Sequence, residues 1–147
     1  MYYLKNISTK KIHSFQDNEK PVDIEDWQEP TSNEKKEIEL ENARSGKISE
    51  IRNIASEKIN FEYPIWKQNN LMSGVITINN KEILAIKSQP PTVYNISEQE
   101  AQILQAANIC KQFIINIRSK SNQLEALVNT MTLEELKFFN PFDNSNW

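Results

Sequence analysis

Two groups of neighbouring carboxylates are the residues whose types could support general acid–base chemistry. One group is Glu134 with Glu135, and the other is Asp23 with Glu25 and Asp26. A catalytic acid needs a pKa raised by burial or by a like charge, so that it holds a proton near neutral pH. Both groups lie in segments that we expect to be exposed, where nothing would shift a pKa. We therefore interpret them as solvated faces and not as catalytic pairs.

Cysteine and histidine each occur once, as Cys110 and His13. A single thiol and a single imidazole cannot build the multi-ligand sites typical of zinc and iron. A nucleophilic Cys–His pair would require Cys110 to leave the apolar helix face described below. Gly46 and Gly74 are too far apart for a glycine-rich phosphate loop. The sequence thus predicts a protein that is not an enzyme and that uses no metal and no cofactor.

The densest polar and aromatic stretch is EYPIWKQNN, residues 62 to 70. One interpretation is a platform for a ligand or a partner protein, with contacts from Trp66, Lys67, Gln68 and Asn69. The other is a corner of the fold, in which Trp66 fills a helix joint and the amides satisfy free backbone groups. Aromatic residues beside a proline corner usually serve packing, so we favour the corner.

The composition limits the classes of partner. The net charge is −3, from 20 acidic and 17 basic side chains that are mixed along the chain, so no basic surface is expected to attract nucleic acid. No apolar run reaches the length of about 18 residues that a membrane span needs, and the N-terminus lacks the pattern of a secretory signal. We expect a cytosolic protein that binds neither nucleic acid nor membrane.

Residues 1–16 predict a small β-hairpin, with strands in YYLKN and KIHSF. Residues 17–31 predict an exposed acidic connector that Val22, Ile24 and Trp27 hold in place. A capping box at Thr31 and Glu34 then predicts a long helix over residues 32–61. Apolar residues are sparse on this helix before Ile48, and from Ile48 onward they recur at the spacing of one helix face.

Pro64 predicts a break and a new helix that begins with it, because proline suits the first helical position but not the interior. We expect this helix to be short, to reach about Ser73, and to end with Gly74 in the left-handed conformation. The following VITINNKEILAI predicts strand, Asn79-Asn80 turn and strand, and KSQPPTVYN predicts a loop. Residues 75–96 are thus expected to form a β-like insertion.

A heptad pattern after the capping box at Ser97 and Glu100 is the clearest periodic signal. Its apolar and small residues are separated by alternating steps of four and three; they are Ile103, Ala107, Cys110, Ile114, Ile117, Ser121, Leu124, Val128 and Met131. A helix over 97–128 would be about 48 Å long, whereas a compact domain of this size is about 38 Å across. The seam must therefore pair with a second helix. We favour antiparallel pairing within the chain together with self-association.

The C-terminal part predicts a short helix and a tail. Thr132 and Glu135 form a third capping box, and Asn140-Pro141 ends the helix. The fold class is therefore mainly α, of the α+β type: an N-terminal β element with connector (1–31), a helical hairpin domain with a β-like insertion at 75–96 (32–140), and a tail (141–147).

Three segments resemble the small proteins encoded beside bacteriophage tail fibres, known as tail-fibre assembly or tail-fibre-associated proteins. They are MYYLKNISTKKIHSFQDNEKPVDIEDWQEPTSNEKKEIE, KISEIRNIASEKINFEYPIWKQNN and NIRSKSNQLEALV. The segment 74–96 departs from the resemblance. The resemblance implies a role without catalysis, in which the protein binds, chaperones or decorates a fibrous tail component.

From the resemblance we expect a structural or accessory protein of tail assembly that is present in the host cytoplasm during synthesis and acts either during assembly or in the virion tail. Its interface is expected in the heptad seam and the platform, through Trp66, Lys67, Gln68, Asn69, Ile103, Ala107, Cys110, Ile114, Ile117, Leu124 and Val128. The alternative is a phage-encoded inhibitor or adaptor that binds a host protein through its acidic connector and helix.

Overall fold

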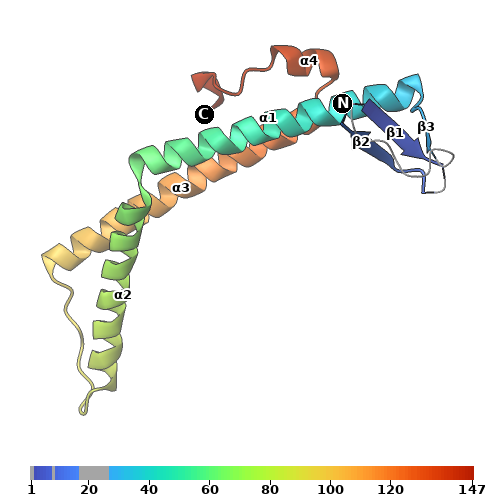
Figure 1. Ribbon diagram of the computed structural model, residues 1–147. Helices are drawn as coiled ribbons and strands as arrows, with labels where there is room; N and C mark the ends of the chain where they lie inside the picture. Colours follow the sequence, from blue (N-terminus) through green and yellow to red (C-terminus); the bar gives the residue numbers. More distant parts are fainter. Residues whose placement is uncertain (1, 8, 17–26) are drawn as a thin grey trace.

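The computed structural model describes residues 2–7, 9–16 and 27–147. Within these residues the chain forms a small antiparallel sheet followed by long helices (Figure 1). The predicted fold class, mainly α with a small β part, is confirmed. Among the described helices, none combines the length and the apolar character needed to cross a membrane.

The sheet lies beside the start of the first helix. Strand β1 (Tyr2–Asn6) pairs with β2 (Ile12–Phe15) as the predicted hairpin, and with β3 (Trp27–Gln28) on its other side. The prediction of an irregular connector was wrong at Trp27, because its ring packs edge-on against His13 at 5.1 Å and so brings this segment onto the sheet. Val22 and Ile24 lie outside the described residues.

Helix α1 (Ser32–Glu62) begins as the sequence predicts. Thr31 Oγ1 accepts from the backbone N–H of Glu34 at 3.3 Å, and the Glu34 carboxylate accepts from the N–H of Thr31 at 2.8 Å. Lys5 of β1 donates to the same carboxylate at 2.5 Å, which ties the sheet to the helix. These bonds, the Lys5 bond first, lower the pKa of Glu34 to about 2.

Helix α2 (Ile65–Lys87) differs from the prediction. Pro64 is its N-cap, not its first residue, and the helix continues through the predicted strands to Lys87. Gly74 does not end it, because this residue lies where α2 packs on α3: an added Cβ would be 2.7 Å from Ile103 Cγ2. The β-branched residues of this segment are helical because burial of Ile78 and contact with α3 override their strand propensity.

Helix α3 (Glu98–Thr130) spans about 50 Å at 1.5 Å per residue. It runs antiparallel to α1 with its C-terminal part and lies against α2 with its N-terminal part (Figure 1). The predicted pairing of the heptad seam within the chain is thus confirmed, and the molecule is elongated. Residues 88–97 join α2 to α3 without regular structure, as expected.

The C-terminal segment returns along α1. Helix α4 (Leu133–Phe138) starts at the predicted capping box and is followed by the turn η2 (Asn144–Asn146). Its Leu136 joins Ile51, Leu124 and Val128 in the main core. The tail docks, because Trp147 packs against this core and its Nε1 donates to the carbonyl of Pro141 at 2.8 Å.

Replacement of the two glycines by alanine should affect the stability of the fold differently. Gly46→Ala should raise the free energy of unfolding by about 1 kcal/mol, because a Cβ there meets nothing within 4 Å and alanine favours helix. Gly74→Ala should lose this gain or become destabilising, since the stiff, β-branched side chain of Ile103 would have to move. Urea unfolding of both variants measures the difference, and an equal gain at both positions would contradict the close α2–α3 packing.

Candidate protein-binding surfaces

The corner between α1 and α2 is filled by Tyr63 and not by Trp66. Tyr63 is 8 % exposed and its ring lies 5.4 Å from that of Phe113 on α3, whereas Trp66 is 64 % exposed. The expectation that Trp66 plugs the joint was wrong, because helix α2 starts at Ile65 with a phase that turns Trp66 outward. Trp66 therefore remains available to a partner.

Two of the polar residues at the corner, Lys67 and Gln68, bind backbone carbonyls, and a third, Asn69, is exposed. Lys67 Nζ donates to the carbonyl of Glu62 at 3.1 Å and lies 4.5 Å from the centre of the Tyr63 ring. Gln68 Nε2 donates to the carbonyl of Tyr63 at 2.6 Å. Both satisfy carbonyls that the end of α1 leaves free, as the corner interpretation predicts. Asn69, in contrast, is exposed.

The residues of the heptad seam lie mostly inside the molecule. Cys110, Leu124 and Val128 are buried; Ile103, Ala107, Ile114 and Ile117 are half-buried. Burial raises the pKa of the Cys110 thiol, which keeps it protonated. The seam is therefore covered by α1 and α2 for most of its length.

The polar seam residue Ser121 has a specific role. Its hydroxyl donates to Glu125 Oε1 at 3.2 Å, and Arg52 of α1 binds the other oxygen of that carboxylate at 2.7 Å. Glu125 consequently has a lowered pKa, chiefly through the Arg52 bond. The three side chains connect α1 to α3 beside the core.

An apolar groove lies between α2 and α3, and we call it the α2–α3 groove. Its volume is 600 Å³. Its walls carry apolar side chains from both helices: Leu71, Met72, Val75, Leu104, Ala107, Ile114 and Ile115. Polar side chains border it, namely Gln68, Asn108, Lys111 and Arg118. An apolar floor with a polar rim is typical of a protein interface. Four residues of this groove were expected at the interface: Gln68, Ala107, Cys110 and Ile114.

Helix α2 also exposes large apolar side chains along its length, and all of them except Met72 lie outside the groove. Along its length the exposed ones are Ile65, Trp66, Met72, Ile76, Ile83, Leu84 and Ile86. A monomer rarely exposes so many on one helix without a partner. This surface was not predicted, because residues 75–86 were assigned to two strands and a turn. The signal that could have found it is the heptad spacing from Ile65 onward.

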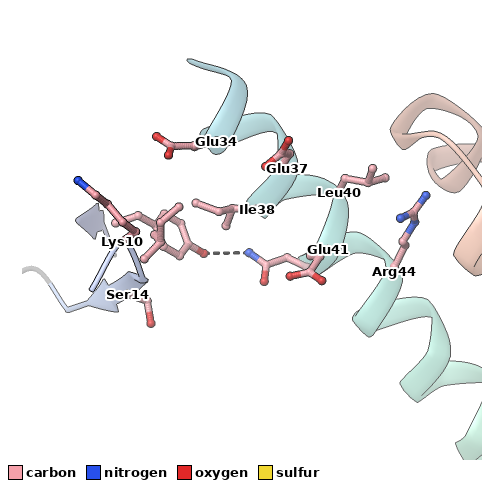
Figure 2. Close-up of a pocket in the computed structure, with 11 residues that line it drawn as sticks. Lys10, Ser14, Glu34, Glu37, Ile38, Leu40, Glu41 and Arg44 are labelled. Carbon is pink, nitrogen blue, oxygen red and sulfur yellow. Dashed lines mark hydrogen bonds between the residues drawn. The ribbon is translucent and has the colours of Figure 1, made fainter. Parts of the chain in front are cut away.

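A second groove, of 690 Å³, lies between the sheet and α1 (Figure 2). Carboxylates of α1 line one side, with Glu34, Glu37 and Glu41, and Lys10 of the hairpin lines the other. Asn42 Nδ2 donates to Tyr3 Oη at 2.9 Å across it. Glu34 is already held by Lys5. The groove is thus a polar surface that fits a basic segment better than an apolar one.

A cluster of polar side chains closes the end of the α2–α3 pair. Glu100 Oε1 accepts from Lys81 Nζ at 2.8 Å and from Tyr94 Oη at 2.5 Å, and its Oε2 accepts from the N–H of Ser97 at 2.9 Å. These bonds, that of Lys81 first, lower the pKa of Glu100 to about 2. They connect α2, the 88–97 loop and α3.

The carboxylate groups considered for acid–base chemistry can be placed only in part. Glu134 pairs with Lys137 at 2.6 Å, and Glu135 accepts from the backbone N–H of Thr132. That bond lowers the pKa of Glu135, which differs from the expectation of no shift and is opposite to what a general acid needs. Asp23, Glu25 and Asp26 lie outside the described residues.

Comparison with known proteins gives no match: no family model, no curated protein and no solved structure is significantly similar to this chain. Within the described residues, no three His, Cys, Asp or Glu side chains gather in a way that could hold a metal ion.

The corner predicts unequal effects of its two aromatic residues. Tyr63→Ala should lower the free energy of unfolding by about 3 kcal/mol, since it leaves a cavity against Phe113. Trp66→Ala should change it by less than about 1 kcal/mol, because this ring is mostly exposed. Urea denaturation of both variants tests whether Tyr63 is the residue that fills the corner. A larger loss of unfolding free energy for Trp66→Ala than for Tyr63→Ala would contradict this.

The Glu100 cluster predicts a pH-dependent contribution to stability. Because the folded-state pKa of about 2 lies below the ordinary value of 4.5, the contribution is complete above pH 4.5 and is lost as the pH falls through 2. Glu100→Gln should therefore have a lower melting temperature than the wild type at neutral pH. The difference in melting temperature should disappear as the pH falls from 4.5 to 2.

The control is Glu98→Gln, which removes a charge from the same first turn of α3. At neutral pH its melting temperature should lie closer to that of the wild type than the melting temperature of Glu100→Gln does. A difference between the wild type and Glu100→Gln that stays constant down to pH 2 would contradict the network. Thermal melts followed by circular dichroism supply both measurements.

Proposed function

We propose that this chain is a non-catalytic protein of bacteriophage tail assembly that binds a tail fibre or a neighbouring tail component, during assembly or in the virion. The observation that carries the binding role is the apolar α2–α3 groove of 600 Å³. The resemblance of the three segments described above supplies the class of partner.

The groove has the chemistry that an unassembled fibre chain needs. Chains of a fibrous trimer expose apolar surface and unpaired strand edges before they associate. A groove with apolar walls can cover one apolar helix face or strand face, while polar rim residues such as Lys111 and Arg118 bind backbone carbonyls or carboxylates at its border.

The fold supports the groove from both ends. At one end Tyr63 packs on Phe113, and at the other Lys81 and Tyr94 bind Glu100. Between them Gly74 allows α2 to approach Ile103 closely. The two helices are thus fixed relative to each other, so the entropic cost of ordering the site on binding is small.

The rival function, inhibition of a host protein through the acidic connector, has less support. It needs free carboxylates in the segment 17–41, yet Glu34 is paired with Lys5 and Glu29 with Lys35. In the described part of that segment, residues 27–41, this leaves Glu37 and Glu41 at the second groove and the exposed Glu39. Residues 17–26 lie outside the described residues.

Co-expression with the tail-fibre and baseplate chains of the same phage tests the proposal. The tagged wild type should capture one of these chains. Ile115→Glu, which places a charge on the groove wall, should weaken capture about tenfold or more. Ile109→Glu is the matched control, because it lies on the same helix, outside the groove lining, with a similar exposure of 53 % against 45 % for Ile115.

Both variants should keep the helical content and melting temperature of the wild type, since both positions are partly exposed. Equal loss of capture by the two variants, or capture of a host enzyme in place of a tail component, would contradict the proposal.

A further inference from the structure

The side of α2 that faces away from α3 carries a second heptad pattern. Its members recur in alternating steps of four and three residues and are all exposed: Ile65, Asn69, Met72, Ile76, Asn79 and Ile83. We call these six residues the outer face of α2. Because α3 packs on the opposite side, through Gly74 and the buried Ile78, the outer face is unpartnered within the described chain (Figure 1).

The outer face is symmetric about residue 74. Counted from this position, Ile65 and Ile83 lie at equal distances, and so do Asn69 and Asn79, and Met72 and Ile76. A second copy of α2 that runs antiparallel and is centred on the same level would therefore place apolar residues opposite apolar ones. It would also place asparagine opposite asparagine, whose amides can hydrogen-bond to each other. Self-complementarity of this kind is what a twofold interface requires.

The asparagines make this register specific. In any antiparallel register shifted by one heptad, Asn69 or Asn79 would face isoleucine or methionine, and its amide would be buried without a partner. Polar residues at single seam positions commonly fix register and oligomeric state in this way. An outer face without asparagines would be more apolar, and it would select less strongly between antiparallel registers.

The residues that flank the outer face also match their counterparts. In the antiparallel pair, Val75 meets Val75 of the second copy, Gln68 lies near Glu82, and Trp66 lies over Asn80. No like charges oppose each other. A parallel pair would instead set Val75 against Asn80 and would align the two helix dipoles, both of which are less favourable.

From these observations we propose that the outer face of α2 binds a second copy of this chain, in an antiparallel helix pair whose twofold axis passes at the level of Gly74. The overlap extends over residues 65–83, about 27 Å at 1.5 Å per residue. The dimer surface borders the α2–α3 groove: Met72, Val75 and Gln68 line the groove as well, whereas Ile76 and Ile83 lie outside it. The dimer is tested on the purified chain, without the proposed tail partner.

Sedimentation equilibrium of the purified chain tests the dimer. The wild type should sediment at twice its mass of 17.2 kDa. Ile76→Glu places a carboxylate beside the twofold axis in each copy, and this variant should sediment as a monomer with unchanged helical content. Leu84→Glu is the matched control: it makes the same kind of exchange on the same helix, at a residue that is 68 % exposed and off the outer face, and it should remain a dimer. A monomeric wild type, or equal effects of the two variants, would overturn the proposal.

Cross-linking tests the direction of the pair. In a Cys110→Ala background, Asn69→Cys and Asn79→Cys are prepared separately, oxidised alone or as a mixture, and analysed on non-reducing gels. The antiparallel pair predicts a covalent dimer in the mixture that is at least several-fold more abundant than in either variant alone. Strong cross-linking of Asn69→Cys with itself would overturn the antiparallel arrangement, because two such residues lie about 15 Å apart along the axis in this pair.

Discussion

The structure depends on one constraint: α3 is a long helix whose apolar side needs more cover than any one other helix supplies. Helix α1 covers its C-terminal part, where Ile51 meets Leu124 and Val128. The chain then breaks at Pro64, and α2 covers the N-terminal part (Figure 1). Since α1 and α2 meet α3 at different angles, α3 connects two packing units. The elongated shape of the molecule follows from this division.

The break at Pro64 also creates the candidate binding surfaces. Proline lacks the N–H that would continue α1, so the chain changes direction, and Tyr63 fills the space beside Phe113. Helix α2 thereby leaves the α1–α3 pair with only one of its sides covered. Its border with α3 becomes the α2–α3 groove and its far side becomes the outer face. Both surfaces consist of residues for which the fold provides no other cover.

The sequence predicted the elements whose signals are local. The three capping boxes, the hairpin and the seam of α3 each follow from residues that are close along the chain. The full length of α2 could not be predicted in this way, because Val75 to Ile78 have strand propensity and Asn79-Asn80 resembles a turn. Burial of Ile78 against α3 decides the conformation. The choice between Tyr63 and Trp66 as the buried aromatic residue depends on the helix phase after Pro64. The groove could not be predicted at all, since it exists only when two correctly assigned helices lie together.

The pairing of α1 with α3 has a consequence for synthesis of the protein. Arg52 and Glu125, which face each other across the two helices, are 73 residues apart in the chain. The ribosome must therefore translate most of α3 before the apolar side of α1 finds its cover, whereas α2 and α3 are connected by a short loop and can associate as soon as both have emerged. Until then Ile51 and Ile54 of the nascent chain stay accessible to molecular chaperones.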